Sequence, residues 1–240
     1  MIRKFFSYSE MYDEITKQFT IADTWYALLL YFVIMISYWG MGRYFYSLGE
    51  RLSGGIFYMI EACNVAGIVA LVLLVCHFRG QGMDTIGLGK ESWMLAVKDA
   101  CIGLVVIIVV VAVAYLLGGR VYYSIGHLIG RFLYYAILIA MVEELFFRGY
   151  LGPRLYGAAC GKWWSITIAA ICFSLVHVPF QAVFQHIPFL EYVVMVWPQL
   201  VFTFVFHIVM QWIFAKRCNL LVPIMIHTFW NFLQEVIYFQ

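Results

Sequence analysis

The sequence predicts an all-α fold, a polytopic membrane helical bundle with about seven transmembrane helices. Composition is the first reason: 65% of the 240 residues are hydrophobic and 12% are charged, whereas soluble domains are about half apolar and a quarter charged. The second reason is a mean hydropathy of +0.89, concentrated in runs of about 20 residues, the length that crosses a bilayer. The third reason is that the long Val, Ile and Leu stretches lack the alternation of a membrane β-barrel strand.

Residues 1–23 are expected to form an amphipathic segment at the membrane surface, because Phe, Tyr, Met and Ile are spaced among charges there. This segment lacks the apolar core and small-residue cleavage site of a signal peptide. Residues 24–240 are expected to form a single transmembrane helical domain. Its seven apolar runs cover residues 24–42, 55–77, 98–117, 127–147, 163–181, 192–214 and 219–237.

The distribution of Lys and Arg predicts a multi-pass protein of the cell membrane with its N-terminus and a 148–162 loop in the cytoplasm. Seven helices then place the C-terminus outside, and the short chain suggests a prokaryotic source. Six cysteines without a CxxC pair, a net charge of +2 and no basic run indicate neither a zinc site nor a nucleic-acid partner. The eleven basic residues on the predicted cytoplasmic side are Arg3, Lys4, Lys17, Arg79, Lys90, Lys98, Arg148, Arg154, Lys162, Lys216 and Arg217, and the four on the other side are Arg43, Arg51, Arg120 and Arg131.

Three charged residues, Glu143, Glu144 and Arg148, interrupt the apolar sequence at the fourth run. At membrane depth an unpaired charge costs about 2.5 kcal/mol or more, so such residues are candidates for function. Glu144 and Arg148 are four residues apart, which predicts an ion pair along one helix face with Glu143 pointing elsewhere. Alternatively, the helix ends here and all three charges are interfacial. If Glu143 is to reach the depth of the later polar residues, the helix must continue to Tyr156, which predicts that Arg148 is buried within the protein.

Two later helices carry further polar residues. His177 lies in the fifth run and, taken alone, is typical of a hydrogen-bonded packing residue. His227 and Asn231 are four residues apart on one face of the last helix, so both can donate hydrogen bonds to a single oxygen. Glu61 and His207 have no matching partner and are predicted to be structural. The residues expected in loops or at helix ends on the outer side are His186, Glu191 and Glu235.

This set of residues can perform hydrolysis without a serine or cysteine nucleophile. Glu143 in a low-dielectric cavity, together with His177, would hold and activate a water molecule as a general base. His227 and Asn231 would stabilise the oxyanion formed when that water attacks an amide carbonyl.

Three other interpretations remain open. The same residues could bind zinc or iron, although no HExxH or ExxH motif supports a ligand set. They could form the proton relay of a transporter, which would predict internal repeats that the sequence does not show. They could also be retained for stability in a non-catalytic scaffold or immunity protein.

The ordered motifs Glu143-Glu144-x-x-x-Arg148, Phe173-x-x-x-His177 and His227-x-x-x-Asn231 resemble those of the CAAX prenyl protease and bacteriocin-processing (CPBP, or Abi) family. The sequence "IGLG" at 86–89, ahead of an apolar run, is also similar. The resemblance covers residues 86–235, which we therefore expect to form the protease core.

The resemblance implies an intramembrane endopeptidase that acts on membrane-associated peptides or proteins and needs no cofactor. Members are often described as metalloproteases, whereas their better-studied mechanism depends on a glutamate. It implies that Glu143 and His177 activate water and that His227 and Asn231 form the oxyanion hole. Glu144 and Arg148 are then the supporting pair of that site. A bacterial source argues against prenylated substrates, and the sequence indicates neither the substrate nor the oligomeric state.

Overall fold

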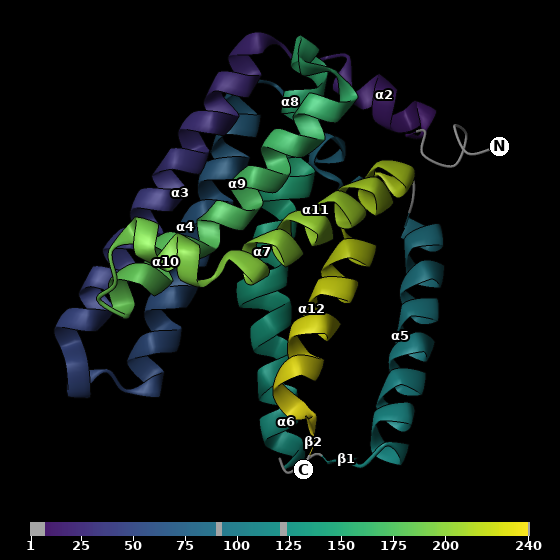
Figure 1. Cartoon of the computed structure of the whole chain (residues 1–240). Coiled ribbons are helices and arrows are strands. Elements are labelled where there is room, and N and C mark those ends of the chain that lie inside the picture. The colour runs from purple at the N-terminus through teal and green to yellow at the C-terminus, as the bar shows by residue number, and fades with distance from the viewer. Residues whose placement is uncertain (1–7, 90–92, 121–123, 240) are drawn as a thin grey trace.

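The structure, a computed structural model, describes residues 8–89, 93–120 and 124–239, and it is helical almost throughout (Figure 1). Arg3, Lys4 and Lys90, which contribute to the predicted orientation, lie outside the described residues, as do the first seven residues of the predicted amphipathic segment. In chain order the elements are α2 (Glu10–Thr16), α3 (Ile21–Leu48), η1 (Gly49–Arg51), α4 (Gly54–Phe78), η2 (Met83–Ile86), α5 (Trp93–Leu116), β1 (Gly119–Arg120), α6 (Ile125–Leu133), η3 (Tyr134–Ala140), α7 (Met141–Glu144), η4 (Leu145–Leu151), α8 (Gly152–Leu155), η5 (Tyr156–Cys160), α9 (Gly161–Phe184), α10 (Phe189–Met195), α11 (Trp197–Arg217), α12 (Leu221–Val236) and β2 (Tyr238–Phe239).

Six stretches within the described residues are long and apolar enough to cross a membrane, which confirms the predicted all-α, multi-pass bundle. The seventh predicted run forms α12, whose 16 residues span about 24 Å, less than the roughly 30 Å hydrocarbon core. The count of about seven is therefore approximate. The six stretches are Ile21–Leu48, Gly54–Phe78, Ala96–Leu116, Ile125–Ala158, Gly161–Phe184 and Trp197–Arg217.

The helices begin where short polar side chains can accept hydrogen bonds from otherwise unpaired backbone N–H groups. Ser53 Oγ accepts from Ile56 N at 3.4 Å at the start of α4. In the same way, Ser124 Oγ accepts from the backbone N–H of His127 at the start of α6. These hydrogen bonds fix two helix starts on the side of the bundle where the C-terminal residues lie (Figure 1).

The helices pack as a bundle in which α9 contacts both α3 and α11, while α12 contacts α5 and the fourth apolar helix. In Figure 1, α12 lies between α5 and α7, and α2 and β2 lie at opposite ends of the bundle. A short antiparallel pairing of β1 with β2 joins the end of α5 to the C-terminal residues. The core is built from buried apolar side chains that include Ile68, Phe146, Phe147 and Phe173.

The fourth apolar helix is continuous from α6 to η5, so it reaches Tyr156 as the position of Glu143 requires. The predicted 148–162 loop is wrong, because residues 148–160 are helical. Arg148 and Arg154 are both 0% exposed, so two of the three charges counted for a cytoplasmic loop lie inside the protein, and Lys162 is partly exposed. Arg154 is held there by Gln81 Oε1 at 2.6 Å and by the carbonyl of Tyr150 at 3.0 Å.

The sixth predicted run is divided into two helices. Residues 189–195 form the short helix α10, and the spanning helix α11 begins at Trp197, with Pro198 in its first turn. Proline is tolerated there because the first turn leaves its N–H groups without an intrahelical partner. The spanning helix therefore starts later than the predicted residue 192.

The segment that precedes α5 packs against the fourth apolar helix. Gly87 adopts φ +76, and its carbonyl accepts a hydrogen bond from Leu220 N at 3.1 Å. A Cβ atom on Gly149 would lie 2.6 Å from the carbonyl oxygen of Ile86. The two backbones can approach this closely only because residue 149 has no side chain.

Candidate active site

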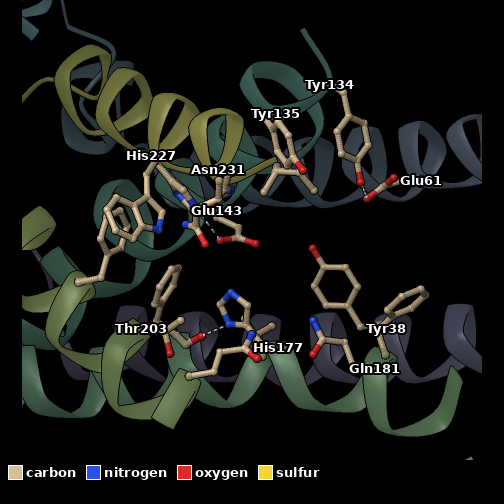
Figure 2. Close-up of a pocket in the computed structure, with 18 of the residues that line it drawn as sticks. Tyr38, Glu61, Tyr134, Tyr135, Glu143, His177, Gln181, Thr203, His227 and Asn231 are labelled. Atoms are coloured by element: carbon tan, nitrogen blue, oxygen red, sulfur yellow. Dashed lines mark hydrogen bonds and ion pairs between the residues drawn. The ribbon is translucent and has the colours of Figure 1, made fainter. Parts of the chain in front are cut away.

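A cavity of about 590 Å³ lies among α3, α4, α9, α11, α12 and the fourth apolar helix. Its lining includes the four residues predicted to be catalytic, Glu143, His177, His227 and Asn231. They come from three helices and face a common space (Figure 2). The tertiary structure therefore brings together side chains that are up to 88 positions apart in the sequence, between residues 143 and 231.

Glu143 and Glu144 occupy one α-helical turn, Met141–Glu144, between the π-helical segments η3 and η4. Such π-helical segments are rare and are frequently found at functional sites. Because the two glutamates are consecutive, they point in different directions. Glu143 lines the cavity and is partly exposed to it, whereas Glu144 is completely buried behind it.

Glu144 forms the predicted pair with Arg148, with Nη1 lying 3.1 Å from Oε1. Arg148 is buried, as the sequence predicts, and its guanidinium carbon lies 4.1 Å from the centre of the Phe173 ring. The same Oε1 of Glu144 also lies 2.8 Å from Nδ1 of His227. Sequence reasoning missed this second contact, because 83 positions separate the two residues.

The ring of His227 lies between two carboxylates. An ionised Glu144 can only accept hydrogen bonds, so Nδ1 of His227 is the donor in that contact. Its other nitrogen, Nε2, lies 3.8 Å from Oε2 of Glu143. This arrangement fixes the ring so that Nε2 is the nitrogen on the side of Glu143.

His177 presents a hydrogen-bond acceptor, rather than a donor, to the cavity. Its Nδ1 lies 2.8 Å from the carbonyl oxygen of Phe173, one turn earlier in α9, and a carbonyl can only accept. In a neutral ring Nε2 is therefore a hydrogen-bond acceptor. Figure 2 shows the His177 ring and the Glu143 carboxylate facing each other across the cavity.

Asn231 lies one turn after His227 in α12 and lines the same cavity. Figure 2 places it beside His227 and Glu143. Its amide thus adds a hydrogen-bond donor close to the Glu143 carboxylate and the His227 imidazole. Among the described residues, no three His, Cys, Asp or Glu side chains form a group that could hold a metal ion.

Residues 125–233 match the family model described as "Type II CAAX prenyl endopeptidase Rce1-like". This segment is therefore similar to the CAAX proteases. It runs from the start of α6 into α12 and contains all six site residues predicted from the sequence. The chain is therefore a multi-pass membrane protein in which the segment 125–233 is similar to a family of proteases. Neither a curated protein nor a solved structure gives a significant match to it.

The cavity also contains polar residues that were not predicted as site residues. Glu61, predicted to be structural, lines the cavity and accepts a hydrogen bond from the hydroxyl of Tyr134 at 3.2 Å. Glu235, expected at a helix end, also lines it and forms a 2.5 Å ion pair with Nη2 of Arg131. A carboxylate inside an apolar run was the available signal for Glu61, because such residues are functional candidates by default.

His207, the other residue predicted to be structural, is fully buried. Its ring centre lies 5.4 Å from that of Phe173 and 6.4 Å from that of Phe147. The ring therefore packs among aromatic side chains, and neither of its nitrogens has a hydrogen-bond partner among the described residues.

Proposed function

We propose that this protein is an intramembrane endopeptidase in which Glu143 activates a water molecule to hydrolyse peptide bonds of membrane-associated peptides or proteins. The observation that carries the proposal is the convergence of Glu143, His177, His227 and Asn231 on one cavity. The similarity of residues 125–233 to the CAAX proteases supports this reaction class. The cavity supplies candidates for each step of that reaction.

Water activation is the first step. The Glu143 carboxylate and Nε2 of His177 are both hydrogen-bond acceptors and face each other. A water molecule between them donates one hydrogen to each, which leaves an oxygen lone pair free to attack a carbonyl carbon. Glu143 accepts the proton as the new C–O bond forms, in the role of a general base.

Stabilisation of the oxyanion is the second step. Attack moves negative charge onto the carbonyl oxygen, and donors placed beforehand around that oxygen lower the barrier. The side-chain amide of Asn231 is one donor. Nε2 of His227 is the second, and it donates only while the ring carries both protons, because Nδ1 already donates to Glu144.

Breakage of the C–N bond completes the reaction. Glu143 returns its proton to the departing amine nitrogen as the C–N bond breaks, and the products are a carboxylic acid and an amine, between which a proton then passes to give a carboxylate and an ammonium. Glu144 and Arg148 are positioning residues in this scheme, since they act only through the ring of His227.

The test is cleavage of membrane-associated peptides by the full-length protein in liposomes. Glu143→Gln keeps the size of the side chain and removes the base, so we expect cleavage to be lost while thermal unfolding is unchanged. Glu191→Gln, which alters an exposed glutamate of α10, is the matched control and should cleave normally. Undiminished cleavage by Glu143→Gln would refute the proposed base.

A further inference from the structure

We propose that Glu61 forms a cation-binding subsite of the cavity, which takes an ammonium or guanidinium group of the peptide substrate. This inference rests on the proposed function, because it names a feature of the substrate of that same site. Glu61 lies in α4, outside the segment matched by the protease family. It is 8% exposed and lines the same cavity as Glu143.

The first observation is that the carboxylate of Glu61 is only half satisfied. Oε1 accepts a hydrogen bond from Tyr134, whereas Oε2 is buried and has no hydrogen-bond partner among the described residues. A buried acceptor left without a donor destabilises the protein, and more so when it is charged. A ligand that brings a donor to this carboxylate therefore removes that destabilisation on binding.

The second observation concerns the charges around the cavity. Three glutamates line it, and none of the described lining residues is Lys or Arg. Glu235 is neutralised by Arg131, which also donates to Tyr58 and Tyr135. Glu143 faces His227. Among the ion pairs of the described residues, none includes Glu61. The charge of Arg131 also acts on Glu61, but its guanidinium is paired with Glu235, so a cation from the substrate would be the direct partner of Glu61.

The surroundings of Glu61 suit a long basic side chain. Tyr38 and Phe57 line the cavity together with it, and Figure 2 shows the hydroxyl of Tyr38 directed into the open space near Glu61. Lys and Arg pack their apolar stems on aromatic rings while the charged end reaches a partner. A cavity of about 590 Å³ is within the range of sites that enclose a small ligand. It has room for a scissile bond at Glu143 and a neighbouring basic group at Glu61.

The test is a binding measurement that does not depend on cleavage. The full-length Glu143→Gln protein in liposomes is titrated with a dye-labelled, N-acetylated apolar peptide that contains one lysine, and with its Lys→Gln counterpart. We expect the lysine peptide to bind about ten-fold more tightly. Adding Glu61→Gln should abolish this difference, whereas adding Glu191→Gln should preserve it. A Gln peptide with a free N-terminus tests whether a terminal ammonium satisfies the same subsite.

A variant with the charge of residue 61 reversed distinguishes a lost subsite from a misfolded protein. Glu61→Lys should reverse the preference toward a peptide that carries glutamate in place of lysine. Equal binding of all basic and neutral peptides, no binding of any of them, or a lysine preference that survives Glu61→Gln would overturn the inference. A lysine preference in a protein whose wild-type form cleaves no peptide would support the subsite and refute the peptidase. Peptide cleavage by the wild-type protein without any preference for lysine would support the peptidase and refute the subsite.

Discussion

Glu144 accepts a hydrogen bond from Nδ1 of His227 at 2.8 Å through the same oxygen that lies 3.1 Å from Arg148. A buried carboxylate thus joins an arginine one turn away in the same helix to an imidazole in α12. Because Glu144 holds Nδ1, only Nε2 of His227 remains on the side of Glu143. The buried carboxylate of Glu144, behind the cavity, thus determines the orientation of the His227 ring within the cavity.

Removing the acceptor at Glu144 should therefore impair catalysis more than substrate binding. We expect Glu144→Gln to lower kcat by about 100-fold or more with little change in KM, because an amide can present the wrong group to His227. Steady-state kinetics on the membrane-reconstituted protein would check this. An increase in KM at constant kcat would argue against a positioning role.

Breaking the buried ion pair should destabilise the fold. Arg148→Met leaves the Glu144 charge buried without its arginine, and we expect a loss of about 3–5 kcal/mol in the free energy of unfolding. Arg217→Met is the matched control, because the Arg217–Asp99 pair is partly exposed and should contribute only about 0–1 kcal/mol. Denaturant unfolding in detergent measures both. The double variant Glu144→Gln/Arg148→Met should recover stability but not activity.

Loss of the Asn231 amide should slow the chemical step. Asn231→Leu is expected to lower kcat by about 10²–10³-fold, on the scale of a lost oxyanion donor. Gln234→Leu makes the same kind of change at another residue of the cavity and should have a much smaller effect. Equal losses in the two variants would mean that general polarity, rather than oxyanion stabilisation, is what Asn231 provides.

The close approach at Gly149 should not tolerate a side chain. Gly149→Ala places a Cβ atom 2.6 Å from the backbone oxygen of Ile86, so we expect a loss of about 1–3 kcal/mol in stability. Gly126→Ala has no atom within 4 Å of the added Cβ and, in helix α6, should be neutral or stabilising by about 0.5–1 kcal/mol. Thermal unfolding of the two variants compares them directly.

The glutamate mechanism and the metal-dependent alternative differ in their response to chelators. If the carboxylate of Glu143 is the proton acceptor, cleavage should persist after prolonged treatment with EDTA and phenanthroline. Activity that disappears with the chelator and returns with added zinc would support the metal-dependent alternative. The Glu143→Gln protein serves as the baseline for both measurements.

Local spacing made part of the site predictable. The four-residue separations of Glu144 from Arg148 and of His227 from Asn231 each specify a shared helix face, whatever the rest of the fold does. Contacts between helices could not be found in this way. The hydrogen bond from His227 to Glu144, and the position of Glu61 on the same cavity as Glu143, depend on how α4, α7 and α12 pack.

The sequence by itself determined that this is a helical membrane protein, because hydropathy and helix length follow from composition and order alone. It also indicated that Arg148 belongs inside the protein. The sequence favoured both a 148–162 loop and a fourth helix that continues to Tyr156. Only the tertiary structure decided between the two, with a helix through residues 148–160, and showed that Arg154 is buried as well. The physical reason is that an arginine is stable in an apolar interior only where carboxylates, amides and carbonyls surround it, and packing alone brings those partners together.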